Sequence, residues 1–216
     1  MEQSDRVKFF LNESTSTGSL VFSLSIIDRD SGDNGRVTWK LDRSSIWIPF
    51  ELIRLTESTG ELRTNGPLDR EQISQYDFVL EAMDNGRPNP KSTRLNFTIE
   101  IIDINDNPPQ FLSMNLNVTI SEHLKIDSNR HGYEIFRLYA QDPDQGANGE
   151  IIYSIIDNDE NIFRIDPKTG VISAQVEFDR HQKNLHVLEV EAHDQGKNID
   201  RGENFFSKRI STFLFS

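Results

Sequence analysis

Acidic and amide side chains recur in short clusters along this chain of 216 residues. The densest cluster is the run Asp103-Ile104-Asn105-Asp106-Asn107, and two related clusters begin at Asp28 and Asp142. Carboxylates, amides and backbone carbonyls are the hard oxygen ligands that Ca²⁺ takes in groups of about six to eight. The chain contains no cysteine, so disulfides and thiolate metal sites are excluded. The clusters therefore predict a cation site made of oxygen atoms.

The overall charge and hydropathy narrow the class of protein. The formal net charge is −12 and the isoelectric point is about 4.8, which argues against nucleic acid as a partner. No segment approaches the ~20 apolar residues of a membrane helix, and the polar start, Met1-Glu2-Gln3-Ser4-Asp5, does not resemble a signal peptide. We expect a fragment of a longer protein, whose membrane anchor would lie outside this sequence.

A repeat of about 110 residues organises the chain. Its landmarks return in the same order, with spacings that change by only a few residues. They are Asp28–Gly35 and Asp142–Gly149, Thr59-Gly60 and Thr169-Gly170, Leu68–Arg70 and Phe178–Arg180, and Glu81–Asp84 and Glu191–Asp194.

Between these landmarks, apolar and polar residues alternate with the period of two that is typical of strands buried on one face. Leu20, Phe22, Leu24 and Ile26 form one inward-facing series. Thr59-Gly60 and Thr169-Gly170 are expected to mark hairpin turns. The predicted strands lie near 7–13, 19–27, 36–41, 50–55, 61–64, 76–83 and 92–102, and near 116–121, 133–140, 149–155, 162–166, 171–175, 185–193 and 207–215.

About seven short alternating strands in about 100 residues are typical of a sandwich with immunoglobulin-like architecture. The lack of cysteine excludes the disulfide-pinned antibody type. We therefore predict an all-β chain of two tandem seven-stranded antiparallel Greek-key β-sandwiches. The predicted boundaries are a first repeat at 1–102, a calcium-binding linker at 103–109 and a second repeat at 110–216.

The strand pattern also predicts where the carboxylates meet. Asp142 and Asp194 each end an apolar strand face, so both should lie at one pole of the second repeat. Glu13 and Asp103 end strands of the first repeat, at the pole opposite Asp28. The two prolines of the linker favour an extended crossing between the repeats.

Five elements together resemble a pair of cadherin repeats. Each element alone is a weak signal, because Asp and Asn also favour turns. All five are present in the family's order across nearly the whole chain. They are Asn12-Glu13-Ser14, Asp69-Arg70-Glu71, Asp103-Ile104-Asn105-Asp106-Asn107, Asp142-Pro143-Asp144 and His193-Asp194-Gln195.

The resemblance implies about three Ca²⁺ ions at the junction between the repeats. Eight carboxylates would contribute −8 there, and three ions would contribute +6, so the metal would cancel most of the repulsion. The implied ligands are Glu13, Asp69, Glu71 and Asp106 for one ion; Glu13, Glu71, Asp103, Asp106, Asp144 and the Ile104 carbonyl for a second; and the Asn105 side chain, Asp142, Asp144, Asp194 and the carbonyls of Asn107 and Asn148 for a third.

The resemblance also predicts which clusters are incomplete. His181 stands where the first repeat has Glu71, and no second linker motif follows Glu122, so we expect no full site at the C-terminal pole. Half a site remains at the other end of the first repeat, made of Asp28, Asp30, Asn34 and Asp84.

Other metal sites fit the sequence less well. An EF-hand loop needs Gly at its sixth position, where this chain has Pro108 or Ala147. His186 and His193 are an odd number of residues apart on one predicted strand, so they face opposite sides and do not form a zinc pair.

Three glycosylation sequons indicate an extracellular protein. They begin at Asn12, Asn96 and Asn117, and each places its Asn on the outward side of a predicted strand, where a glycan needs to be.

These features predict a calcium-dependent adhesion or cell-surface structural module, stiffened by Ca²⁺. The rival prediction is a calcium-dependent extracellular enzyme or lectin, but no nucleophile–base arrangement is evident. The resemblance implies other cadherin-type ectodomains as partners, homophilic or heterophilic, with no nucleic acid and no small-molecule substrate. No tryptophan precedes Trp39, which favours a non-classical cadherin or an internal repeat pair.

Overall fold

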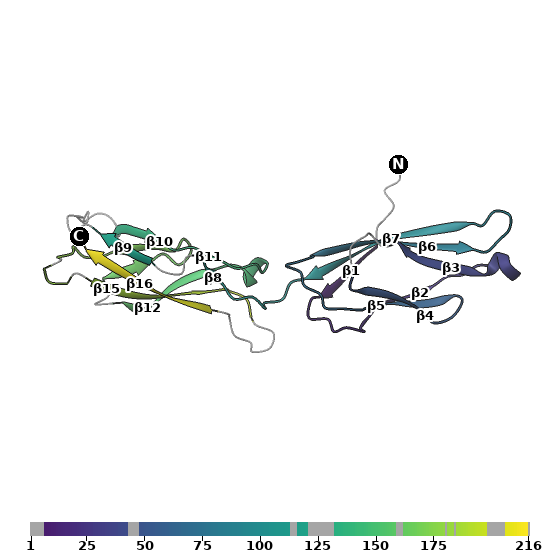
Figure 1. Cartoon of the computed structure of the whole chain (residues 1–216), viewed down its shortest axis with the longest axis horizontal. Coiled ribbons are helices and arrows are strands. Elements are labelled where there is room, and N and C mark those ends of the chain that lie inside the picture. The colour runs from purple at the N-terminus through teal and green to yellow at the C-terminus, as the bar shows by residue number, and fades with distance from the viewer. Residues whose placement is uncertain are drawn as a thin grey trace. The chain divides into compact units, whose positions relative to one another are not determined.

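The computed structural model describes residues 7–42, 48–112, 116–120, 132–158, 162–179, 181–183, 185–197 and 206–215. The chain divides into two compact units, Met1–Asp103 and Ile104–Ser216. In the part of each unit that the structure describes, the elements are strands and one short 3₁₀ helix (Figure 1). Within the described residues, no helix has the length and apolar character needed to cross a bilayer.

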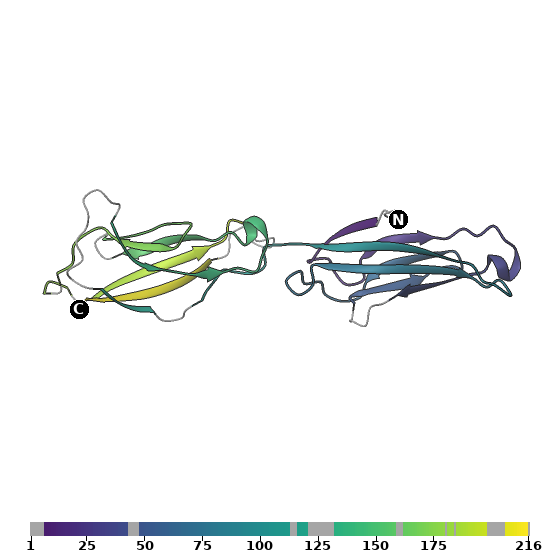
Figure 2. The ribbon, with the colours of Figure 1, turned by 90° about the horizontal axis from the view of Figure 1, so that it is seen from above.

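The first unit is a sandwich of two sheets with strand orders β1-β7-β6-β3 and β2-β5-β4. Successive strands along the chain mostly change sheet, so hydrogen-bonded neighbours are often distant in sequence. The long strands β6 and β7 lie side by side (Figure 2). The elements are β1 (Val7–Asn12), β2 (Leu20–Ser25), η1 (Gly32–Gly35), β3 (Val37–Asp42), β4 (Phe50–Arg54), β5 (Thr59–Thr64), β6 (Gln75–Asp84) and β7 (Ser92–Ile102).

The core of the first unit follows from the alternation. Burial along β6 changes at almost every residue, so Tyr76, Phe78 and Leu80 point inward. Phe97 packs face to face on Phe78 with ring centroids 5.0 Å apart, and Leu62 of the opposite sheet is fully buried. These side chains close the space between the two sheets.

The second unit repeats this plan, with sheets ordered β12-β15-β16-β9, β10-β14-β13 and β11-β8. Leu188, Val190 and Ala192 of β15 are fully buried, as the alternation predicts. The elements are β8 (Gln110–Phe111), β9 (Leu116–Ile120), β10 (Tyr133–Arg137), β11 (Ala140–Gln141), η2 (Gly146–Asn148), β12 (Ile152–Asn158), β13 (Phe163–Ile165), β14 (Val171–Ala174), β15 (Leu185–His193) and β16 (Phe206–Phe215).

The predicted fold class, two tandem all-β sandwiches, is confirmed, but one pairing in each unit differs from the antiparallel prediction. β1 pairs with β7 in parallel, and β9 pairs with β16 in parallel. Strands joined by a hairpin must run antiparallel, whereas these partners are the first and last long strands of their units. Their direction therefore depends on how the sandwich closes and cannot be read from local patterns.

Two local predictions in the first unit were wrong. Thr59 and Gly60 begin β5 and pair with β4, so the turn precedes them in the sequence. Leu20 is 48% exposed although it continues an inward series. A bulge between Leu20 and Phe22 shifts the register of β2 against β5, and an inserted residue reverses which side chains face the core.

The predicted strand at 133–140 is two strands in the structure. β10 pairs with β14, whereas β11 pairs with β8, a two-residue strand that the sequence pattern did not predict. Between them, the Leu138 N–H donates to the Gly170 carbonyl at 2.9 Å. The alternation continues through a change of pairing partner, so periodicity does not reveal the break.

Candidate metal centre

Three predicted ligands of the first unit converge. Glu13, Asp69 and Glu71 each offer a carboxylate oxygen, and these atoms lie within 4.8 Å of one another. Two oxygens that bind one Ca²⁺ at 2.3–2.6 Å are separated by at most about 5 Å. The spacing and the purely carboxylate chemistry of this group therefore fit calcium.

Strand pairing and a tight turn position this group. Glu13 follows β1 directly, its backbone N–H donates to the Ile102 carbonyl at 3.2 Å, and its side chain is buried. Asp69 opens a turn in which its carboxylate accepts the Gln72 backbone N–H at 2.9 Å. The same turn directs the Arg70 backbone N–H to the Glu13 carboxylate at 2.8 Å, which ties the loop to the end of β1.

Arg70 supplies positive charge inside this acidic group. Its guanidinium contacts both the Glu71 and the Asp103 carboxylates. Burial by itself would lower the pKa of Arg70, but the negative charges of Asp103, Glu71 and Glu13 outweigh burial and raise the pKa. Arg70 therefore stays protonated and links Asp103 to the other carboxylates of the first unit.

Replacing Arg70 by methionine should destabilise the protein far more in a chelator than in Ca²⁺. Without metal, Arg70 is the neighbouring cation for Glu71 and Asp103, and the loss of a charged hydrogen-bonding partner costs about 2 kcal/mol. With Ca²⁺ bound, the metal would cancel most of the repulsion. Thermal melts of both proteins in Ca²⁺ and in EGTA test this, and Arg63→Met, which removes an ion pair with Glu61, is the control. If Arg70→Met lowers the melting temperature equally in Ca²⁺ and in EGTA, the prediction is wrong.

In the second unit, one pair of predicted ligands is joined by a hydrogen bond. The Asn105 side-chain amide donates to the Asp194 carboxylate at 2.9 Å, and Asp194 is fully buried. Asp194 follows β15, whose apolar face leads to it. The prediction that this strand carries a carboxylate to the pole of the unit is consistent with this contact.

A second group of predicted ligands surrounds Asp144. Its two carboxylate oxygens accept the Asn107 backbone N–H at 3.2 Å and the Asn107 side-chain amide at 2.8 Å. The same amide donates to Asp106 at 2.7 Å, and the Asp144 N–H donates to Asp142 at 3.0 Å. The Ile104 carbonyl accepts the Asp106 N–H at 3.1 Å. The segment from Ile104 to Asn107 is thus hydrogen-bonded within the second unit.

Two glycines at this pole were missed as site residues. A Cβ on Gly149 would lie 2.1 Å from the Asp144 carbonyl oxygen. A Cβ on Gly196 would lie 2.2 Å from Asn148 Oδ1 and 2.6 Å from Asn105 Nδ2. Both glycines therefore permit close approach of the acidic loops. The repeat contained the signal, because Gly35 and Gly86 hold the same places in the first copy.

The half-site predicted in the first unit has the same local hydrogen bond as the acidic cluster that begins at Asp142. The Asp30 N–H donates to Asp28 at 2.9 Å, matching Asp144 and Asp142. The Asp84 carboxylate accepts the N–H groups of Gly86 and Lys91. In the second unit, Asp179 accepts the His181 N–H at 2.9 Å, whereas Glu122 lies outside the described residues.

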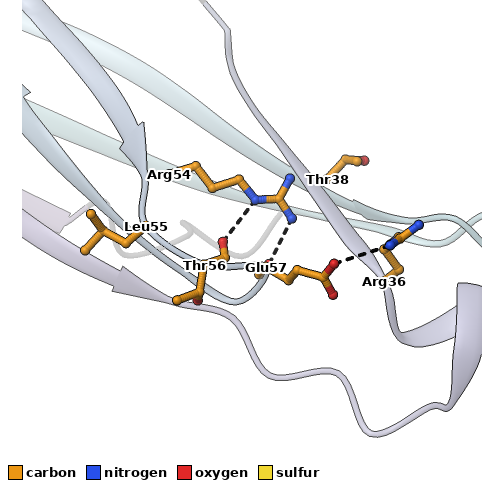
Figure 3. Close-up of a pocket in the computed structure, with 6 residues that line it drawn as sticks. All are labelled: Arg36, Thr38, Arg54, Leu55, Thr56 and Glu57. Carbon is orange, nitrogen blue, oxygen red and sulfur yellow. Dashed lines mark hydrogen bonds and ion pairs between the residues drawn. The ribbon is translucent and has the colours of Figure 1, made fainter.

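One surface pocket lies on the first unit. It is lined by residues at the start of β3 and in the β4–β5 hairpin, and its two arginines contact the hairpin turn (Figure 3). The Arg54 guanidinium donates to the carbonyls of Thr56 and Glu57, at 3.0 and 3.2 Å, and Arg36 lies 3.4 Å from the Glu57 carboxylate. The lining residues, Arg36, Thr38, Arg54, Leu55, Thr56 and Glu57, include no nucleophile–base pair.

Comparison with protein families gives a match in both units. The family model described as Cadherin domain matches residues 8–102 and 122–204. Protocadherin Fat 2 of Rattus norvegicus is 37% identical over 190 residues, which are 86% of this chain and 4% of that protein. Protocadherin gamma-C4 of Homo sapiens is 36% identical over 192 residues, which are 86% of this chain and 20% of that protein. The chain thus spans a fifth or less of these relatives.

Comparison with solved structures also finds cadherin ectodomains. The Protocadherin GammaB4 extracellular domain has a TM-score of 0.86 and 31% identity, over 98% of this chain and 32% of that one. A fragment of mouse Cadherin-23 has a TM-score of 0.79 and 27% identity, over 99% of this chain and 64% of that one.

Proposed function

Because the chain belongs to the cadherin family, we propose that it is a calcium-dependent cell-adhesion and cell-surface structural module. In this proposal, Ca²⁺ ions join the acidic group that ends the first unit to the acidic group that begins the second. Asp103 and Ile104 are consecutive in the chain and fall on the two sides of the unit boundary. The segment 103–109 would act as the linker.

One observation carries the proposal: the carboxylate oxygens of Glu13, Asp69 and Glu71 lie within 4.8 Å of one another. Three carboxylates at that spacing repel one another, and the single positive charge of Arg70 offsets only part of their negative charge. The hydrogen-bonded acidic groups around Asp144 and Asp194 supply the same hard-oxygen chemistry from the second unit. The proposed ligands are therefore those that the five acidic elements predicted, distributed over both units.

Bound calcium would supply multivalent positive charge that holds carboxylates from two units together. The protein's own groups prepare these ligands. The Arg70 N–H holds Glu13 beside its turn, and the Asn105 amide holds Asp194 in the buried pole of the second unit. About three ions would then restrict the motion that two linked domains otherwise show.

The proposed setting is extracellular, as part of a longer protein held at the plasma membrane by another segment. The solved relative named above is an extracellular domain, which supports this setting. The partners would be other cadherin-type ectodomains, either copies of the same protein or different ones. The matched relatives are cadherins and give no support to the rival prediction of an enzyme or a lectin.

Removing Ca²⁺ should let the two units move independently while each sandwich stays folded. Each unit has its own buried apolar core, Leu62 and Ile99 in the first and Leu188 and Val190 in the second, so neither needs the metal to fold. Small-angle X-ray scattering should show a broader distribution of dimensions in EGTA than in Ca²⁺. Far-UV circular dichroism should stay the same. Scattering that does not respond to chelation would contradict the proposed role of calcium.

A further inference from the structure

The exposed side of β1 carries an aromatic ring directly beside a glycosylation sequon. Phe10 is 57% exposed and lies two residues before Asn12, which is also exposed. Residues two apart in a strand point to the same face and are about 6.6 Å apart along it. Phe9 and Leu11, on the opposite face, pack against the core of the first unit. Phe10 and Asn12 are therefore neighbours on the solvent side.

A second exposed apolar side chain flanks Asn12. In the parallel pairing of β1 with β7, Asn12 is the partner of Ile102, which is 44% exposed. Adjacent strands lie about 4.8 Å apart. Asn12 thus has an apolar neighbour along its own strand and another on the next strand. The Phe10 partner, Glu100, is ion-paired with Lys8, so the apolar surface ends there.

We infer that Asn12 carries an N-linked glycan whose innermost sugar packs on Phe10 and Ile102. This inference rests on the extracellular setting of the proposed function. In the modification, the Asn12 side-chain nitrogen forms a bond to the anomeric carbon of a lipid-pyrophosphate-linked oligosaccharide. The bond from that carbon to the pyrophosphate oxygen breaks, the lipid pyrophosphate leaves with the electron pair, and the nitrogen loses one proton.

The innermost sugar, N-acetylglucosamine, suits this surface. One face of a pyranose ring consists of C–H groups, and it can lie on the face of an aromatic ring and remove apolar area from water. The backbone after Asn12 turns at once, since the Thr15 N–H donates to the Asn12 carbonyl at 2.9 Å. This turn leaves both Asn12 and Ser14 of the sequon exposed.

The glycan and the proposed calcium ligand occupy opposite sides of one tripeptide. Glu13 is 6% exposed and its carboxylate accepts the Arg70 N–H at 2.8 Å, whereas Asn12 faces solvent. Asn12 ends β1 with its side chain toward solvent, and the turn that follows directs Glu13 inward. A glycan on Asn12 therefore leaves Glu13 in place.

The sequon at Asn96 is an internal control, because it lacks the aromatic neighbour. Two residues before it stands Arg94, which is ion-paired with Glu81. The Thr98 hydroxyl of that sequon donates to Asp77 at 2.6 Å and is 2% exposed. A glycan there would have no exposed ring on its own strand to pack against.

The test uses the chain secreted from animal cells behind a signal peptide, in a background with Asn96→Gln and Asn117→Gln. Peptide mass spectrometry after amidase removal of glycans in heavy-oxygen water should show Asn12 modified. Glycan removal should lower the melting temperature of the first unit by about 4 °C. The Phe10→Thr variant keeps a strand-forming residue at this exposed position, and it should lose that dependence. Because both proteins gain the same aspartate on deglycosylation, the comparison isolates the ring.

The outcomes separate this inference from the proposed function. In the parent chain, which keeps Asn96 and Asn117, an unmodified Asn12 together with a modified Asn96 or Asn117 would overturn the inference and leave the extracellular setting intact. An equal loss of melting temperature with and without Phe10 would overturn the packing on the ring. The Asn12→Gln variant, which needs no glycan removal, should melt like the deglycosylated protein. Calcium titration of the same samples tests the proposed metal sites independently.

Discussion

Replacing Asp106 by alanine is expected to weaken the binding of at least two of the three proposed Ca²⁺ ions. Asp106 is assigned to two of the ligand sets, so its loss weakens both ions at once. Changing a group that merely orients a metal ligand typically costs about 10–100-fold in affinity. Loss of a shared carboxylate ligand should cost at least as much. We therefore expect a loss of at least about tenfold at two sites, from a starting Kd of ~10⁻⁴–10⁻³ M.

The matched control is Asp28→Ala in the first unit. Asp28 has the same local hydrogen bond as Asp142, but its half-site has no second group of ligands in this sequence. Titration calorimetry of Asp106→Ala, Asp106→Asn and Asp28→Ala should therefore show large, intermediate and negligible losses. Equal losses in the two alanine variants would refute the assignment of the junction ligands.

Chelation should expose the linker to proteolysis and lower the melting temperature of the chain. Without metal, the carboxylates assigned to the ions repel one another and loosen the segment 103–109. At a tenfold excess of Ca²⁺ over Kd, each site adds roughly 1.4 kcal/mol, and three sites add about 4 kcal/mol. For a chain of this size that corresponds to a shift on the order of 10 °C.

A protease that cleaves after acidic residues is the appropriate probe, since the linker contains Asp103 and Asp106 but no Lys or Arg. In EGTA, the fragment masses should report cuts at these two positions, and in Ca²⁺ these cuts should be suppressed. Mg²⁺ should protect poorly, because it requires a tight octahedral shell and releases water reluctantly. An identical digestion pattern and melting temperature in all three conditions would show that the junction does not bind calcium.

The fold prediction rested mainly on the internal repeat and on the alternation of apolar and polar residues. The strands near 76–83 and 185–193 were predicted within about one residue of β6 and β15, because one face of each is mostly apolar. The family resemblance, read from five short acidic elements, is confirmed by the domain match in both units. Side-chain alternation is a local property, so it can be read without knowing which strands pair.

The sequence allowed the oxygen-bearing residues of the candidate site to be listed, but it did not reveal which of their side chains contact one another. The sequence shows that Arg70 lies between two acidic residues, whereas the fold brings its guanidinium to Asp103 at the end of β7. In the sequence, Gly196 is marked by nothing more than the matching Gly86 of the first copy. The fold places the side chains of Asn148 and Asn105 where any Cβ at that position would be. Both contacts join segments far apart in the chain, so neighbouring residues carry no trace of them.

The sequence by itself determined the all-β class and the two repeats, because each depends on residue type and short-range spacing, and the family resemblance supplied the list of proposed hard-oxygen ligands. Only the tertiary structure decided the parallel pairing of β1 with β7 and the bulge that exposes Leu20. It also decided that Asn12 pairs with Ile102 beside an exposed Phe10. Strand direction, register and cross-strand neighbours are set when the two sheets close around a shared core. That closure depends on all strands at once and on no single segment.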